Sequence, residues 1–185
     1  MKKIILSFAA VLVFCLTACA NKKAEQKQET SRKALVVFFS ATGTTADVAQ
    51  RLAAAAGAEL YEIKPAKPYT SADLDWRDKQ SRCFIEMHNL SFRPALKSKK
   101  DNIADYDVIY LGYPIWWNIA PTIVNSFIEA HGMKGKTVVP FATSGGSGID
   151  NSVKELKKAY PEINWKDGAL LNNADETTLG RLLTK

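Results

Sequence analysis

Short apolar runs alternate with helix-period patterns along the chain from Lys33 onward. A short apolar run predicts a buried strand, whereas apolar residues three and four positions apart predict one face of a helix. Strands are predicted at Leu35–Phe39, Glu59–Ile63, Val108–Leu111, Thr137–Ala142 and Ala169–Leu171. The helices between them are predicted to end at Ala56 and Gly132, and to begin near Ser152 and Thr177. This alternation predicts an α/β fold, a parallel sheet with helices on both faces.

Individual residues refine the ends of these elements. Pro121 suits the first position of a helix, because its missing N–H needs no partner there. Ser152 and Glu155 have the spacing of a capping box, which predicts a helix start near Ser152. Pro140 lies in the fourth predicted strand, where a proline removes a ladder hydrogen bond. We therefore expect a strand start or a bulge at Pro140.

Residues 65–102 interrupt the alternation and form an insertion. The segment is long and charged, and it carries Trp76, Arg77, Arg82 and Arg93. Loops of this length in compact domains are usually functional or contain local structure of their own. A short packed segment is predicted from its apolar residues Phe84, Ile85, Met87 and Leu90.

The first residues have the plan of an export signal. Two lysines precede the apolar run Ile4–Leu16, which is too short to span a bilayer stably. The run ends in Leu-Thr-Ala-Cys, which resembles the lipobox of bacterial lipoproteins. That resemblance implies a lipoprotein signal peptide over residues 1–18, lipidation of Cys19 and a membrane-anchored protein of a bacterial cell envelope. The alternative is an ordinary signal peptide with a chance cysteine near its cleavage site.

Residues 19–32 are polar and lack aromatic side chains, so they predict a flexible tether. The domain at 33–185 that follows is long enough for a hydrophobic core. The net charge is +6, or +4 without Lys2 and Lys3. A basic surface is either a solvated face or an attraction to anionic lipid or an acidic partner. The export signal argues against a nucleic acid partner.

The sequence lacks the residues that an internal disulfide or a metal site would need. Of the three cysteines, only Cys83 lies in the predicted domain, so no internal disulfide is expected. His131 precedes Gly132 at a predicted helix end, where a cation suits the helix dipole. His88 has no ligand-like spacing around it. We expect both histidines to be structural and predict no metal site.

Three predicted loops follow strands whose carboxyl ends meet at one edge of the sheet, where ligands of doubly wound folds bind. The first, at 40–45, places hydroxyls and one glycine between a strand and a helix, a setting that fits a phosphate. It contains no lysine and lacks the dinucleotide glycine spacing, so it matches neither standard nucleotide motif. The alternative is that Thr44 and Asp47 simply cap the helix.

The second and third loops offer surroundings for a flat ring. At 112–118, Trp116 and Trp117 form an aromatic wall. Core packing is the alternative, although two consecutive residues of an extended segment cannot both face one core. At 143–148, a glycine-rich backbone can approach a ring edge closely. A hydrolase nucleophile elbow at Ser147 is excluded, because Ile149 stands where that motif needs glycine.

The three loops resemble those of the flavodoxins, in particular the branch that reads Tyr-Pro-Ile-Trp-Trp in the second loop and Thr-Ser-Gly-Gly-Ser-Gly in the third. The resemblance covers nearly all of residues 33–183. It implies a flavodoxin-like doubly wound, five-stranded parallel sheet in the order 2-1-3-4-5, with FMN as the cofactor. By this likeness the FMN phosphate is held by Ser40, Thr42, Gly43, Thr44 and Thr45. The isoalloxazine is flanked by Pro114, Ile115, Trp116, Trp117 and Asn118, and by Thr143, Ser144, Gly145, Gly146 and Gly148.

The chain departs from the flavodoxin pattern at two points. It is basic and carries an export signal, whereas cytoplasmic flavodoxins are usually acidic, and its third loop lacks the tyrosine that often covers the outer face of the flavin. The resemblance implies an electron carrier with an unidentified redox protein partner. The alternatives are an FMN-dependent NAD(P)H:quinone-type oxidoreductase, with a second pocket built by Arg77, Arg82 or Arg93, and a lipoprotein that keeps the fold without flavin.

Overall fold

The computed structural model describes residues 32–184. Its sheet runs in the order β2-β1-β3-β4-β5, with β6 also paired to β4, and every pairing is parallel. This is the doubly wound order 2-1-3-4-5, so the predicted fold class is confirmed. The strands are β1 (Ala34–Phe38), β2 (Glu59–Glu62), β3 (Val108–Pro114), β4 (Thr137–Thr143), β5 (Asn164–Trp165) and β6 (Ala169–Leu170).

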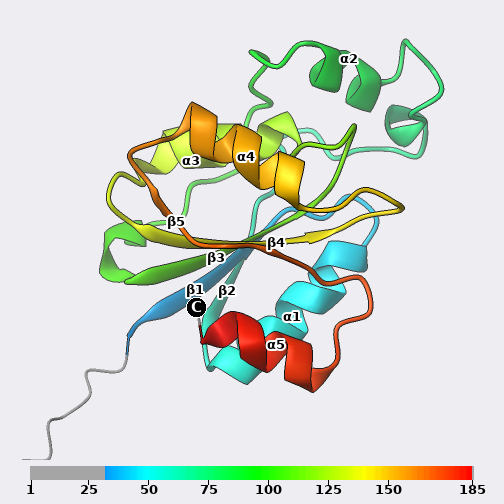
Figure 1. The fold of residues 1–185 in the computed structure, drawn as a ribbon. Helices are drawn as coiled ribbons and strands as arrows, with labels where there is room; N and C mark the ends of the chain where they lie inside the picture. The colour runs from blue at the N-terminus through cyan, green and yellow to red at the C-terminus, as the bar shows by residue number, and fades with distance from the viewer. Residues whose placement is uncertain (1–31, 185) are drawn as a thin grey trace, which may run out of the picture. The chain divides into compact units, whose positions relative to one another are not determined.

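Helices cover both faces of the sheet. Figure 1 shows α3 and α4 above the sheet and α1 and α5 below it. The helices are α1 (Thr44–Ala56), α2 (Arg82–His88), α3 (Thr122–His131), α4 (Asp150–Ala159) and α5 (Glu176–Leu183), with short 3-10 turns at Ala72–Leu74 and Ile103–Asp105.

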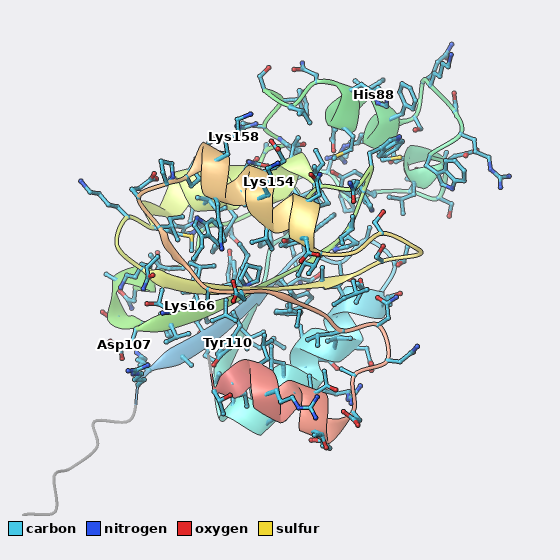
Figure 2. All side chains as sticks on the ribbon, viewed as in Figure 1. His88, Asp107, Tyr110, Lys154, Lys158 and Lys166 are labelled. Carbon is cyan, nitrogen blue, oxygen red and sulfur yellow. The ribbon has the colours of Figure 1, made fainter. Side chains whose placement is uncertain are left out.

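The central strands are buried on both sides. In β1, Leu35 and Val37 pack with α3 and α4, whereas Val36 and Phe38 pack with α1 and α5. None of these four side chains is more than 4% exposed. Tyr110 of β3 lies on the α1 and α5 side, below the sheet in Figure 2. Burial on both faces requires apolar residues at every position, which is why these strands appear in the sequence as continuous apolar runs.

The edge of the sheet beside β4 is interrupted opposite Pro140. The backbone N–H of Lys166 donates to the carbonyl oxygen of Val138, and that of Leu171 to the carbonyl oxygen of Ala142, both at 2.8 Å. Alternate residues of β4 therefore face this edge, and Pro140 is the one between. Pro140 lies inside a continuous strand, at the gap between β5 and β6, so the predicted strand start or bulge is wrong. β6 corresponds to the predicted fifth strand, and β5 was not predicted.

The start of α4 also differs from the prediction. The helix begins at Asp150, so Ser152 lies inside it and forms no capping box with Glu155. The buried hydroxyl of Ser152 instead donates to the carbonyl oxygen of Ile149 at 2.7 Å and lies 3.1 Å from the hydroxyl of Tyr113. The Ser152 side chain therefore contributes to the packing of α4 against β3, although the sequence pattern predicted that it would cap the helix.

The regular elements extend into all three of the predicted loops. β3 continues to Pro114 and β4 to Thr143, so the loops after them are shorter than predicted. α1 begins at Thr44. α3 begins at Thr122, so Pro121 precedes the helix rather than taking its first position.

His131 is a structural residue, as expected, but not the helix-end cation that its position suggested. Its Nε2 accepts the backbone N–H of Lys100 at 2.9 Å, so Nδ1 carries the proton and donates to the carbonyl oxygen of Phe127 at 2.7 Å. Burial lowers the pKa of His131, which favours this neutral form. The neutral ring fastens the end of the insertion to α3.

The insertion, residues 65–102, forms an ordered arm. Figure 1 shows it beyond the carboxyl ends of the strands, on the side that carries α3 and α4. Its two ends pair at Pro65 and Leu96. The predicted packed segment corresponds to α2, in which Met87 is buried. Ile85 and Leu90, however, are more than half exposed, so the prediction was wrong for these two residues.

A buried carboxylate holds the insertion together. Glu86, 2% exposed, accepts hydrogen bonds from Arg82 Nε at 2.6 Å and from the Tyr69 hydroxyl at 2.5 Å. The Arg82 guanidinium also lies 3.9 Å from the centre of the Tyr69 ring. Burial and the bond to Glu86 raise the pKa of Tyr69 far above its ordinary value, so the phenol keeps the proton that it donates. We call Tyr69, Arg82 and Glu86 the Glu86 cluster.

Several sequence predictions fall outside the described residues. These are the signal peptide at 1–18, the lipidation of Cys19 and almost all of the tether. Within residues 32–184, the structure contains no helix with the length and apolar character needed to cross a membrane.

The Glu86 cluster leads to a stability prediction. Arg82→Ala should lower the free energy of unfolding by about 3 kcal/mol, because it leaves Glu86 buried without its cation. Arg77→Ala is the matched control, since Arg77 is exposed and should change stability by less than about 0.5 kcal/mol. Urea unfolding followed by circular dichroism measures both. Equal losses in the two variants would contradict a structural role for Arg82.

Candidate functional site

Three loops leave the carboxyl ends of β1, β3 and β4 at one edge of the sheet. The strand register brings these ends together, because Phe38 pairs with Gly112 and Pro114 pairs with Thr143. We call residues 39–43 loop one, residues 115–121 loop two and residues 144–149 loop three.

Loop one presents hydroxyls and free backbone N–H groups. Gly43, at φ +94°, turns the chain into α1, and its N–H donates to Ser40 Oγ at 3.1 Å. The N–H groups of Thr42, Thr44 and Thr45 have no acceptor among the residues that the structure describes. No side chain caps α1, so the alternative role of Thr44 as a helix cap is not observed. Free N–H groups at the positive end of a helix attract an anion.

A buried pair of hydroxyls ties α1 to the end of β4. Thr45 and Thr143 are 1% and 4% exposed, and their Oγ1 atoms lie 2.8 Å apart. Both residues were predicted to contact the cofactor. Their side chains instead bond to each other and position the neighbouring loops, so Thr45 has its backbone N–H to offer a ligand.

Loop two folds back on itself and points its tryptophans in different directions. The backbones of Trp116 and Ile119 exchange two hydrogen bonds of 3.0 Å, and Trp117 and Asn118 adopt positive φ angles of 45° and 65° at the tip. Trp116 packs edge-on against Phe39, with ring centres 5.7 Å apart, whereas Trp117 is 39% exposed. Core packing, the alternative explanation, therefore explains in part where the Trp116 side chain lies, but it does not explain the exposed position of Trp117.

Ser144 organises loop three. Its Oγ accepts the N–H groups of Gly146 at 3.1 Å and Ser147 at 2.8 Å. Its own N–H donates to Asn172 Oδ1 at 2.7 Å, and its carbonyl oxygen accepts from Asn172 Nδ2 at 2.5 Å. Asn172 thus clamps the loop at two points. Asn172 could not be identified from the local sequence, because only the fold brings it beside Ser144.

The three loops and the insertion surround a mostly apolar cavity of about 610 Å³. Cavities of this size are typical of small-molecule sites. Eight of the predicted cofactor residues line it, namely Thr42, Pro114, Ile115, Trp116, Trp117, Ser144, Gly145 and Gly146. The lining residues that sequence reasoning missed are Ala41, Leu74, Trp76, Cys83 and Ser147.

The remaining predicted residues do not line this cavity. Ser40, Gly43 and Thr44 flank Thr42 in loop one and at the start of α1. Asn118 lies at the tip of loop two, where its carbonyl oxygen accepts a hydrogen bond from a side chain of α4. Gly148 is exposed at the end of loop three. The structure thus brings the predicted loops together, but not every residue in them faces the same space.

The residues needed for a serine hydrolase or for a metal site do not come together among the described residues. Ser147 has no histidine partner, because His88 stacks on Phe84 with ring centres 3.7 Å apart and His131 is bound between the insertion and α3. Within residues 32–184, no three metal-ligating side chains gather at one point.

The site fits an elongated ligand with a phosphate at one end and a flat ring at the other. Loop one offers N–H groups and hydroxyls, which are the donors that bind phosphate at helix N-termini. The cavity beside it offers aromatic walls. A Cβ built on Gly145 or Gly146 would meet nothing within 4 Å, so these glycines leave open space next to the backbone. A ring can therefore approach loop three closely.

The chain is similar to several solved flavoproteins. A crystal structure of a protein inferred to be a flavoprotein, from Bacteroides eggerthii, is 61% identical, covers 83% of this chain and 96% of its own, and has a TM-score of 0.81. A second such structure, from Bacteroides uniformis, is 55% identical, covers 83% and 99%, and has a TM-score of 0.80. A flavoprotein from Lactobacillus acidophilus, solved in complex with FMN, shares the fold at 20% identity, with coverage of 83% and 99% and a TM-score of 0.67.

Comparison with curated proteins gives no match. The sequence model of the family described as Flavodoxin matches residues 33–184, which include every strand and helix of the structure. The match agrees with the strand order, with the loops at the strand ends and with the two structures that are more than half identical. The chain therefore belongs to the flavodoxin family.

Proposed function

We propose that this protein binds FMN and carries single electrons between redox partners. The observation that carries the proposal is that the free N–H groups of loop one adjoin an apolar cavity lined by Trp116 and Trp117. FMN combines a phosphate and a flat ring in one molecule, and these are the two features that the site accommodates. The FMN complex of the Lactobacillus acidophilus flavoprotein supports this choice at the level of the fold.

Loop one and the start of α1 would hold the phosphate. The N–H groups of Thr42, Thr44 and Thr45 are its donors, together with the hydroxyls of Thr42 and Thr44, which lie 3.5 Å apart on the exposed side. Gly43 makes the turn that aims these groups at one point. An anion there gains from the positive end of the α1 dipole without a charged side chain.

Loops two and three would surround the ring. Bound FMN supplies the redox chemistry, and the chain determines the polarity and hydrogen bonding around it. The two tryptophans of loop two would line one side of the ring. Asn172 and Ser144 hold loop three in place, so that Gly145 presents its backbone to the cavity at a fixed position.

A carrier is favoured over an NAD(P)H-dependent reductase. A reductase needs a second cradle for the nicotinamide pyrophosphate, and three arginines of the insertion were the candidates. Arg82 is bound in the Glu86 cluster, and Arg93 pairs with Glu129 at 2.9 Å. Arg77 stacks on the exposed ring of Trp76, 5.0 Å from its centre. Two of the three are thus committed to structural contacts.

The first prediction concerns the cofactor. Residues 33–185 should bind FMN more tightly than riboflavin, and Thr42→Val or Thr44→Val should weaken FMN binding about tenfold by removing a donor to the phosphate. Riboflavin affinity should not change in either variant. Flavin fluorescence titration measures both ligands, with Thr184→Val, at the far end of α5, as the control. Equal affinity of the unchanged domain for FMN and riboflavin would refute a phosphate site.

The second prediction separates carrier from reductase. The FMN-loaded protein alone should oxidise NADH and NADPH negligibly, since two of the three arginines that could bind a second phosphate, Arg82 and Arg93, are already paired with carboxylates. Addition of a flavodoxin reductase should then reduce its flavin, which provides the positive control. The measurement is the anaerobic change in nicotinamide and flavin absorbance. Fast, saturable reduction by NADH or NADPH alone, abolished by Arg77→Ala, would instead identify a reductase with its substrate site on the insertion.

We also propose that the protein is exported and anchored to a membrane of the cell envelope through a lipid on Cys19. The support is the lipobox-like Leu16–Cys19 after an apolar run, followed by a polar tether. A flexible tether at 19–32 would span on the order of 20 Å. Its redox partner would therefore be a protein that reaches the same membrane surface.

The third prediction tests this anchor. Cys19→Ala should move the protein out of the membrane fraction or leave the signal uncleaved, because the acyl chains supply the membrane affinity. Cys15→Ala, four residues earlier in the apolar run, is the matched control and should leave the protein in the membrane fraction. Fractionation and mass spectrometry of the N-terminal peptide give the readout. An unmodified mature N-terminus at any other residue would contradict lipidation.

A further inference from the structure

The insertion contributes a wall to the cavity that the sequence did not predict. Leu74, Trp76 and Cys83 line the same space as Thr42 of loop one, Trp117 of loop two and Gly145 of loop three. Cys83 is buried at 2%, whereas Trp76 is 62% exposed. The insertion thus supplies a buried part of the wall at Cys83 and a large, exposed aromatic side chain, Trp76, at the open side of the cavity.

Three aromatic contacts join this wall to loop two. Tyr69 of the insertion meets Trp116 edge-on, with ring centres 5.6 Å apart. Phe84 and His88 of α2 meet Trp117 edge-on at 5.8 and 5.6 Å. Figure 2 labels His88 on α2, at the part of the insertion remote from the sheet. The insertion is therefore anchored to the same two tryptophans that line the cavity.

The Glu86 cluster makes this anchor rigid. The ring of Tyr69 that contacts Trp116 carries the hydroxyl that donates to the buried Glu86. Glu86 belongs to α2, which also carries the residues that contact Trp117. The hydrogen bonds of Glu86 thus fix Tyr69 and α2 relative to one another, so that the rings that contact Trp116 and Trp117 form one unit.

Loop three offers no aromatic side chain to the cavity. Its residues from Ser144 to Gly148 are two serines and three glycines. A flat ring in the cavity would have tryptophans from loop two and open space beside loop three. Among the other lining residues, Trp76 is the one aromatic side chain. Its other ring contact is with the flexible side chain of Arg77.

We propose that the insertion is a fixed arm that completes the flavin site, with Trp76 covering a face of the isoalloxazine that loop three leaves open. The inference rests on the proposed binding of FMN. It gives the insertion a function in cofactor binding and assigns to Trp76 the role of a ring-contacting residue. Arg77, whose guanidinium lies 5.0 Å from the centre of the Trp76 ring, would steady the indole at the open side of the cavity.

The test compares three variants of the full chain purified in detergent. Trp76→Ala removes the proposed cover, and Trp76→Phe keeps an aromatic ring. Ile85→Ala is the matched control, because Ile85 is a similarly exposed apolar residue of the same insertion that does not line the cavity. Each protein is titrated with FMN and with riboflavin, and the accessibility of the bound ring is measured by iodide quenching of flavin fluorescence.

Trp76→Ala should weaken FMN and riboflavin equally, about five- to tenfold, because the lost contact is with the ring and not with the phosphate. Iodide quenching of the bound flavin should rise in the same variant. Trp76→Phe should restore most of both properties, and Ile85→Ala should match the unchanged protein.

Two outcomes separate the failure of this inference from the failure of the proposed function. If the unchanged protein takes up no flavin, the proposed function itself is wrong. If it binds FMN but Trp76→Ala leaves affinity and quenching unchanged, FMN binding stands and the role of Trp76 is refuted. A loss confined to FMN, with riboflavin unaffected, would also overturn the inference, because it would place Trp76 at the phosphate end.

Discussion

The central strands of this sheet have no polar face, and the location of the site depends on that constraint. Helices cover β1, β3 and β4 on both sides, and even the backbone of Gly112 has a ring of β4 against it, with a Phe141 carbon 2.1 Å from where a Cβ would lie. Polar groups are therefore confined to the strand ends. Because every pairing in the sheet is parallel, three carboxyl ends meet at one edge, and the hydroxyls, glycines and tryptophans of loops one to three gather there.

The insertion changes a site of three loops into a site of four segments. A buried carboxylate is costly unless it is fully bonded, and Glu86 is bonded to both Arg82 and Tyr69. The same tyrosine meets Trp116 edge-on, so the hydrogen bonds of Glu86 also hold the ring that contacts the wall of the cavity. The stability of the arm and the shape of the site thus depend on the same side chains.

The features that were predicted correctly from the sequence are those that the local pattern of apolar residues determines. Apolar runs identified the central strands, because burial on both faces leaves no polar positions in them. The predictions that were wrong are those that tertiary contacts decide: Ser152 bonds to Tyr113 instead of capping a helix, and His131 is neutral because it accepts the N–H of Lys100. Asn172 and Trp76 carried no local signal, since their neighbours at the site are distant in the chain.

Pro140 lies beside the edge of the sheet at which a strand of another molecule could add. A sheet edge with an unbroken row of unpaired N–H and C=O groups can recruit a strand from a second molecule and begin aggregation. Here the strand beside β4 consists of two pieces of two residues each, and the gap between them faces a residue that has no N–H to offer. An incoming strand would find matched partners for only a short stretch on that side. The proline in this central strand therefore lies where no partner needs its missing N–H, and the two short pieces beside it leave little length on which a further strand could pair.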